Sequence, residues 1–206
     1  LYPQILLILL IFASQQIIKS IQSPFMDTIQ EYNSVIEHCQ NLFIRKTKDY
    51  GTAWRIMRLS SITDQIYIKA QRIRTLEVKQ VSKVGEGIAD EYIGIINYCV
   101  IAMLQIELGE DGEENLDPTF VNQKYNEKVE QTRDLMLAKN HDYGEAWRDM
   151  RISSLTDLIL MKIHRVKQIE DNGGQTIVSE GINANYQDML NYAVFALIKM
   201  GLATQK

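Results

Sequence analysis

Tryptophan, arginine and lysine residues stand at fixed spacings in this chain, and the same arrangement occurs twice. The residues are Trp54, Arg55, Arg58, Lys69 and Arg72 in the first copy and Trp147, Arg148, Arg151, Lys162 and Arg165 in the second. A guanidinium group can bind phosphate through two N–H groups, and an aromatic ring can stack on a base. Both copies are therefore suited to bind a nucleotide. In the alternative interpretation, the tryptophans belong to the core and the cations pair with nearby acids.

Carboxylates accompany these cations. We assign catalysis to four duplicated aspartates, namely Asp49, Asp64, Asp142 and Asp157. Six further acids offer the oxygen ligands that Mg²⁺ prefers, and they are Glu37, Glu86, Glu91, Glu130, Glu180 and Asp188. Each duplicated pair also has a structural interpretation, as helix caps, turn residues, solvent-exposed groups or partners of a helix dipole.

The two acids of one potential metal-binding pair are split between the last predicted helices of the two copies. Two acids three positions apart lie on neighbouring turns of one helix face, where they suit Mg²⁺. Glu91 stands in one copy and Asp188 in the other, so neither copy holds a complete pair. A composite site and a single degenerate site are both compatible with this pattern.

An asparagine lies within each of these apolar helices. Asn97 follows Ile95-Ile96 and Asn191 follows Met189-Leu190. An amide buried among apolar residues is costly without hydrogen-bond partners. The two asparagines therefore predict either a structural hydrogen bond between the halves or a ligand contact.

The elements that position these groups form a tandem duplication. The segment KTKDYGTAWR at 46–55 reappears as KNHDYGEAWR at 139–148, and the match continues at a fixed offset. We divide the chain into an apolar extension (1–25), repeat 1 (26–109), an acidic linker (110–118) and repeat 2 (119–206). The extension is expected to be a non-physiological start or a truncated signal or anchor segment, and its deletion is expected to leave folding intact.

Apolar residues recur every three or four positions, which predicts an all-α fold. One helix begins at Met26 and is broken by Asp49-Tyr50-Gly51, and further helices are expected at about 62–79, 84–108, 118–139, 155–170 and 177–200. Ser61 with Asp64 and Ser154 with Asp157 fit capping boxes. We expect an internally duplicated helical bundle with pseudo-two-fold symmetry, in which the duplicated charges converge on a polar cleft in each half.

Composition limits the partners. A formal net charge of -4 disfavours strong duplex DNA binding, and residues 26–206 contain no expected membrane segment. The two cysteines, Cys39 and Cys99, lie in apolar surroundings and favour a reducing, cytoplasmic location. Association into a homo-oligomer stays open.

The combined motifs resemble the nucleotide modification associated domain 1 family, a domain of unknown function. The resemblance rests on Lys-x-x-Asp-Tyr-Gly-x-x-Trp, on the Thr-Asp helix with its lysine and arginine, and on Glu-Gly-Ile before an Asn-Tyr helix, over about 27–108 and 120–202. It implies a role in nucleotide metabolism or modification. A more distant similarity to all-α nucleoside triphosphate pyrophosphohydrolases of the MazG and dimeric dUTPase type implies carboxylates that hold Mg²⁺, but their paired acids are not intact here.

The sequence thus predicts a protein that binds a nucleotide or a nucleoside triphosphate. The enzyme hypothesis is Mg²⁺-dependent pyrophosphohydrolysis, in which carboxylates hold the metal and cations neutralise phosphate. The alternatives are a non-catalytic nucleotide sensor or accessory subunit, and a structural or protein-interaction module.

Overall fold

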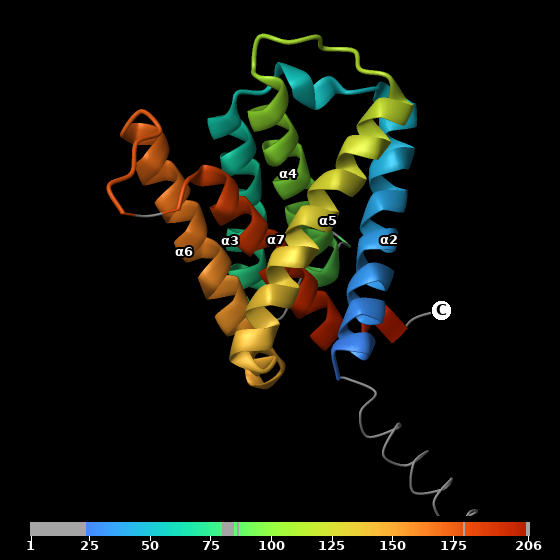
Figure 1. Ribbon diagram of the computed structural model, residues 1–206, viewed down its shortest axis with the longest axis vertical. Helices are drawn as coiled ribbons and strands as arrows, with labels where there is room; N and C mark the ends of the chain where they lie inside the picture. The colour runs from blue at the N-terminus through green and yellow to red at the C-terminus, as the bar shows by residue number, and fades with distance from the viewer. Residues whose placement is uncertain (1–23, 80–84, 86, 179, 205–206) are drawn as a thin grey trace, which may run out of the picture.

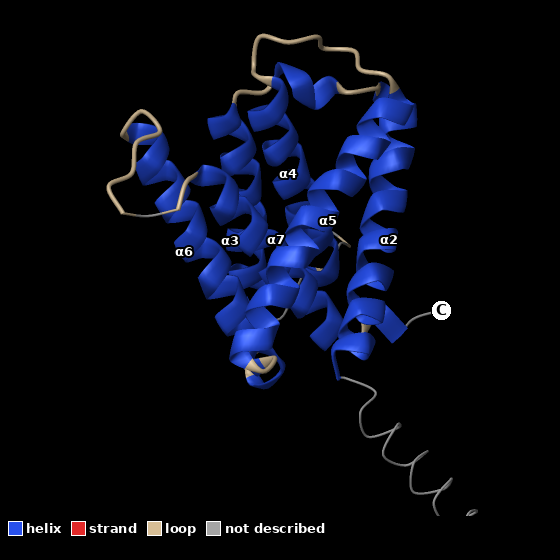
Figure 2. Ribbon diagram, in the orientation of Figure 1, coloured by secondary structure: helices blue, strands red, loops and turns tan. Residues whose placement is uncertain are grey.

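The computed structural model describes residues 24–79, 85, 87–178 and 180–204 (Figure 1). These residues form helices and loops and contain no strand (Figure 2). The α-helices are α2 (Pro24–Tyr50), α3 (Leu59–Lys79), α4 (Ile88–Leu108), α5 (Pro118–Tyr143), α6 (Ile152–Asp171) and α7 (Ile182–Lys199), and the short 3-10 helices are η1 (Ala53–Ile56), η2 (Ala146–Asp149) and η3 (Leu202–Thr204). The all-α prediction is confirmed. The expectation for residues 1–25 falls almost wholly outside the described ranges.

Two copies of one helical unit make up the bundle. Repeat 1 runs α2, η1, α3, α4, and repeat 2 runs α5, η2, α6, α7. When the two repeats are exchanged, the helix contacts map onto one another: α3 packs on α4 as α6 packs on α7, and α2 packs on α7 as α5 packs on α4. The pairs α4 with α7, α3 with α6 and α2 with α5 map onto themselves. This pattern is that of the expected pseudo-two-fold arrangement.

Helices α4 and α7 form the centre of the bundle. Helices α3 and α6 lie on one side of this pair and α2 and α5 on the other (Figure 1). Almost every side chain of 91–105 and 185–198 is buried, which matches their strongly apolar sequences. Helix α4 is long and apolar enough to cross a membrane by length and composition, but 67% of its most apolar stretch is buried inside the bundle. It is therefore packed as a core helix.

The duplicated glycine ends the first helix of each repeat. Gly51 and Gly144 adopt positive φ values of 64° and 59°, a conformation that side chains with a Cβ disfavour. Their N–H groups donate to Thr47 and Asn140 carbonyls at 2.9 Å. The chain then turns through η1 or η2 into the next helix, as the Asp-Tyr-Gly motif predicts.

The capping boxes expected at Ser61–Asp64 and Ser154–Asp157 are wrong. Helices α3 and α6 begin earlier, at Leu59 and Ile152, so both serines lie inside the first turn. The preceding 3-10 helix brings the chain directly into the helix, and the Glu110 carboxylate of the linker accepts the Leu59 N–H at 2.7 Å. A tertiary contact thus supplies an acceptor that the local sequence was expected to provide.

The buried asparagines join the repeats through crossed hydrogen bonds. The Asn97 amide donates to the Cys39 carbonyl at 3.1 Å and accepts the Tyr125 hydroxyl at 2.9 Å. In the symmetric arrangement, Asn191 donates to the Thr132 carbonyl at 3.2 Å and accepts the Tyr32 hydroxyl at 3.0 Å. Each amide therefore contacts the first helix of both repeats, which confirms the structural interpretation of these asparagines.

A second crossed set of hydrogen bonds joins α3 to α7 and α6 to α4. The Thr63 and Tyr186 hydroxyls lie 2.7 Å apart, as do those of Thr156 and Tyr92. Each threonine also donates to a carboxylate of the other repeat, Glu170 or Glu77. Burial raises the pKa of both carboxyls. These polar contacts hold the repeats in one register because any shift would leave buried groups unpaired.

Arg55 attaches the linker to repeat 1. Its buried guanidinium donates to Gln105 Oε1, to the Gly109 carbonyl at 2.8 Å and to the Glu113 carbonyl at 3.0 Å. A Cβ at Gly112 would lie 2.5 Å from the Arg55 Nη2, so a larger residue there would displace the end of this arginine side chain. The arginine therefore sets the path of the chain into repeat 2.

We expect Tyr32→Phe and Tyr125→Phe each to lower the free energy of unfolding by ~1–2 kcal/mol. Each change leaves a buried asparagine oxygen without its donor. Urea unfolding would measure the loss. Tyr143→Phe is the control, because this side chain is 74% exposed. Equal stability of all three variants would contradict a structural role for the crossed bonds.

Arg55→Ala is expected to cost about 2–3 kcal/mol, because it removes the donor to the Gln105 Oε1 and to the Gly109 and Glu113 carbonyls. Arg58→Ala serves as the matched control, since Arg58 is exposed at the adjoining helix start. Thermal and urea unfolding of both variants would be compared. A stable Arg55→Ala protein, or equal losses in the two variants, would refute the linker role.

Candidate functional site

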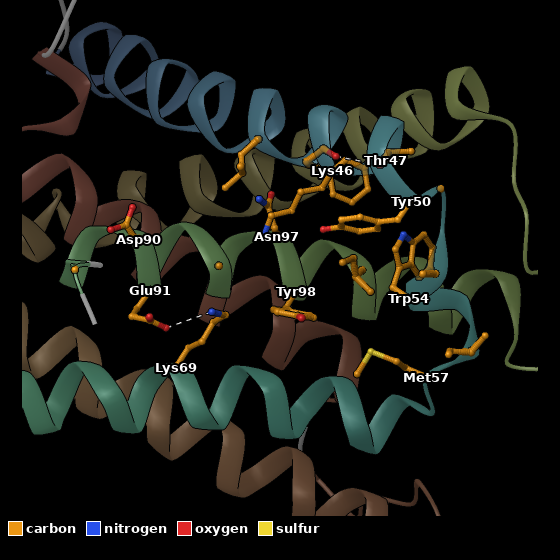
Figure 3. Close-up of a pocket in the computed structure, with 18 residues that line it drawn as sticks. Lys46, Thr47, Tyr50, Trp54, Met57, Lys69, Asp90, Glu91, Asn97 and Tyr98 are labelled. Atoms are coloured by element: carbon orange, nitrogen blue, oxygen red, sulfur yellow. Dashed lines mark hydrogen bonds and ion pairs between the residues drawn. The ribbon is translucent and has the colours of Figure 1, made fainter. Parts of the chain in front are cut away.

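A cavity of about 670 Å³ opens in repeat 1 between α2, η1, α3 and α4 (Figure 3). The first helix reaches it through its last two turns, where the Lys-x-x-Asp-Tyr-Gly motif lies. Helix α4 forms the opposite wall. The lining residues are Leu42, Phe43, Lys46, Thr47, Tyr50, Gly51, Ala53, Trp54, Ile56, Met57, Lys69, Gly85, Asp90, Glu91, Gly94, Asn97, Tyr98 and Ile101.

Aromatic side chains gather at the η1 end of this cavity. Tyr50, Trp54 and Tyr98 lie together there, with Met57 beside them (Figure 3). Tyr50 is 58% exposed, so its ring is accessible to a ligand. Partial burial and the neighbouring Tyr98 and Asp49 raise the pKa of Tyr50, which keeps its hydroxyl protonated at neutral pH. The indole Nε1 of Trp54 is buried and has no partner within the described chain. These groups form a stacking surface with polar edges.

The other end of the cavity carries an ion-pair cluster. Glu91 is buried and pairs with Lys69 at 3.3 Å and with Arg72. Lys69 reaches Glu91 across Gly94, where a Cβ would meet the lysine side chain at 2.6 Å. Asp90 lies beside this cluster and accepts the Gly87 N–H at 2.7 Å. Both Glu91 oxygens are therefore engaged by cations.

Lys46 lines the cavity from α2. It is exposed and forms no ion pair or hydrogen bond with any residue that the structure describes. It differs in this from Lys69, whose ammonium is committed to Glu91. Lys46 is thus a cation available to an anionic ligand.

The corresponding positions in repeat 2 carry side chains that pack against one another. Trp147 stacks on Phe195 with ring centroids 4.2 Å apart and an interplanar angle of 4°. Lys139 and Lys162, the counterparts of Lys46 and Lys69, each bind Asp188 at 2.6 Å. Phe195 and Asp188 stand where repeat 1 has Ile101 and Gly94. Two larger side chains in repeat 2 therefore occupy positions that leave repeat 1 open.

The predicted site residues separate into several groups. Trp54, Lys69, Glu91 and Asn97 line the cavity, and Arg72 adjoins it through Glu91. Asn97 already has its amide bonded within the protein. Trp147, Lys162, Asp188 and Asn191 are packed inside repeat 2.

The expectation that the remaining charges converge on a cleft is wrong within the described chain. Most of the remaining predicted charged residues are exposed and do not line the cavity, and these are Glu37, Asp49, Arg58, Asp64, Glu130, Asp142, Arg151, Asp157, Arg165 and Glu180. Asp64 instead pairs with Lys167 of α6 at 2.6 Å, and Asp142 lies beside His141. Glu86 lies outside the described residues. Helical periodicity allowed these groups to share a face, but the faces that carry them point to solvent.

The duplicated arginines after tryptophan are also structural. Arg55 binds the linker, and Arg148 pairs with Glu145 and Glu31, both at 2.7 Å. The Lys199 ammonium also donates a hydrogen bond to the Arg148 backbone carbonyl. Each arginine fastens its turn to another part of the bundle, so neither is available to a phosphate.

The acids that the sequence offered for Mg²⁺ do not fit that role in the described chain. No three acidic, histidine or cysteine side chains come together there as a metal site. Glu91 and Asp188 are each held by two cations, and they belong to different repeats. Mg²⁺ prefers several oxygen ligands in octahedral geometry, and this donor set does not supply them.

Sequence reasoning missed three residues of the cavity. Lys46, Tyr50 and Tyr98 belong to the duplicated Lys-x-x-Asp-Tyr-Gly and Asn-Tyr motifs. The sequence-based prediction assigned roles only to the aspartate and the asparagine of these motifs. The recurrence of these three residues in both repeats could have drawn them to notice. The sequence could not show that Lys46 is free to bind a ligand, because Lys139 occupies the same motif position and is paired with Asp188.

Comparison with known proteins identifies the family. The nucleotide modification associated domain 1 description matches residues 46–106 and again residues 139–200. No curated protein and no solved structure gives a match. The two matched segments contain the cavity-forming turn and α4 of repeat 1 and their filled counterparts in repeat 2. The chain belongs to the nucleotide modification associated domain 1 family and carries two copies of its domain.

Proposed function

We propose that this protein binds a nucleotide in the cavity of repeat 1. The observation that carries the proposal is one cavity that combines the Tyr50, Trp54 and Tyr98 rings with the Lys46 ammonium, which has no partner in the described chain. Aromatic rings stack on bases of any identity, and an ammonium group binds phosphate as a point charge. The base would lie against the aromatic end, and the phosphate would contact Lys46.

The size of the cavity agrees with this ligand. About 670 Å³ lies in the range of small-molecule sites, which are mostly apolar with a few polar groups. Leu42, Phe43 and Ile101 supply apolar surface around the aromatic rings. The family description, nucleotide modification associated domain 1, supports a ligand of the same class.

Binding without hydrolysis is the form of this function that the described side chains favour. Pyrophosphohydrolysis of the kind expected from the more distant resemblance needs carboxylates that can accept Mg²⁺. In repeat 1 the Glu91 carboxylate faces Lys69 and Arg72, and Gly94 replaces the acid that would complete a pair. We therefore propose a nucleotide sensor or an accessory subunit of a nucleotide-modifying system.

Repeat 2 would then serve as a structural partner. Its Trp147–Phe195 stack and its Lys139–Asp188–Lys162 cluster occupy the equivalent space. One ligand per chain is the stoichiometry expected from this asymmetry.

Tyr50→Ala is expected to weaken nucleotide binding by roughly tenfold or more, because stacking on one aromatic side chain contributes about 1–3 kcal/mol. The measurement is calorimetric titration with a panel of ribo- and deoxyribonucleotides, each with and without Mg²⁺. Tyr143→Ala, the same motif position in repeat 2, is the matched control and should bind like the parent protein. Pyrophosphate release in the same samples would favour the enzyme hypothesis instead, and equal binding by both variants would refute the assigned position of the base.

Lys46→Ala should also weaken nucleotide binding by about tenfold, with no change in thermal stability, since its ammonium lacks a partner in the described chain. Lys48→Ala removes an exposed charge from the same turn and provides the control. A phosphate role predicts that the loss disappears when the corresponding nucleoside is the ligand. If Lys46→Ala binds nucleotide as the parent protein does, Lys46 is not the phosphate contact.

A further inference from the structure

The charges of the described side chains that line the cavity cancel one another. Lys46 and Lys69 contribute two positive charges, and Asp90 and Glu91 contribute two negative charges. A site for a nucleoside triphosphate would need a clear positive excess, because desolvating several phosphate charges is costly unless cations neutralise them. The sequence-based expectation of a triphosphate ligand assumed this excess from cations that the fold directs elsewhere.

Lys69 does not supply the missing charge. Its ammonium lies 3.3 Å from Glu91, and the absence of a side chain at Gly94 lets the lysine lie flat against α4 to reach that carboxylate. Arg72 is paired with the same carboxylate. Releasing either cation toward a phosphate would leave the buried Glu91 with less compensation, which is strongly unfavourable.

The end of the cavity that carries the ion-pair cluster also disfavours a long phosphate chain. Asp90 and Glu91 lie at the end of the cavity opposite Trp54 and Met57 (Figure 3). Asp90 is exposed, and its carboxylate accepts a backbone N–H and no side-chain cation within the described chain. A phosphoryl group near this end would approach the Asp90 carboxylate, while Lys69 and Arg72 stay paired with Glu91. Lys46 alone can balance at least half of the charge of a single phosphate monoester, which is about −1.5 to −2 at pH 7.

We infer that the ligand class is a nucleoside monophosphate, and that the cavity discriminates against the triphosphate by charge. This inference rests on the proposed nucleotide binding and adds the phosphorylation state that the site accepts. The monophosphate gains the Lys46 contact that a nucleoside lacks. Among the described residues, the additional phosphates of a di- or triphosphate gain no further cation from the cavity wall, and they approach Asp90.

The test is a titration of the intact chain with the nucleoside, monophosphate, diphosphate and triphosphate of each common base. The titrations are done in EDTA so that no metal masks phosphate charge. The expected order is tightest binding for the monophosphate and progressively weaker binding for the diphosphate and triphosphate. A triphosphate that binds as tightly as the monophosphate, or more tightly, overturns the inference and leaves nucleotide binding intact. If none of these compounds binds, the proposed function itself fails.

The Asp90→Asn variant tests whether the charge of the cavity wall, rather than the shape of the cavity, causes the discrimination against the triphosphate. The asparagine retains an oxygen that can accept the Gly87 N–H, so the start of α4 is preserved. Triphosphate affinity should rise by roughly threefold to fivefold and nucleoside affinity should stay constant. Asp134→Asn, an exposed change of the same net charge on α5, controls for the overall charge of the protein. Equal triphosphate affinity in Asp90→Asn, Asp134→Asn and the parent protein would overturn the assignment of discrimination to the cavity wall.

Discussion

The need to hydrogen bond two asparagine amides in the centre of the bundle determines how the repeats pack. Asn97 and Asn191 lie on the most buried helices, where an unpaired amide would cost more than a typical hydrogen bond contributes. Their partners come from the first helices of both repeats, through Tyr125 and Tyr32. Because these bonds cross between repeats, they place α2 and α5 against α4 and α7. The position of α2 relative to α4 in turn opens the cavity that holds Lys46 and Tyr50.

Duplication supplied two equivalent frameworks, and a few side chains made them different. Gly94 leaves room for Lys69 to pass, while Asp188 in the same position binds two lysines. Ile101 leaves the tryptophan of repeat 1 partly exposed, while Phe195 stacks on Trp147 and covers it. The buried carboxylate has thus moved by one helical turn between the copies. In each repeat this carboxylate forms ion pairs with two cations, but only in repeat 1 does the space around it stay open.

Recurrence in both repeats marked structural residues more clearly than the residues proposed to bind a ligand. The arginines of the Trp-Arg motif recur because each fastens a turn to a distant segment: Arg55 binds the linker and Arg148 binds the start of α2. The asparagines recur because both central helices need crossed bonds. Lys46 and Lys139 also recur, yet one is unpaired in the described chain and the other is neutralised by Asp188. A repeated residue therefore identifies a shared position, and its chemistry depends on what the other helices bring to it.

The amino-acid sequence is enough to predict the all-α class, the duplication, the helix breaks at Gly51 and Gly144 and the burial of the two asparagines. These properties follow from periodicity, backbone conformation and the cost of burying an amide, all of which act over a few residues. Only the tertiary structure decided that Arg55 is a linker anchor, that Asp64 faces Lys167, and that repeat 1 is open while repeat 2 is filled. The reason is that an ion pair or a stacked ring depends on side chains from helices far apart in the sequence, and a local pattern carries no information about which partner arrives.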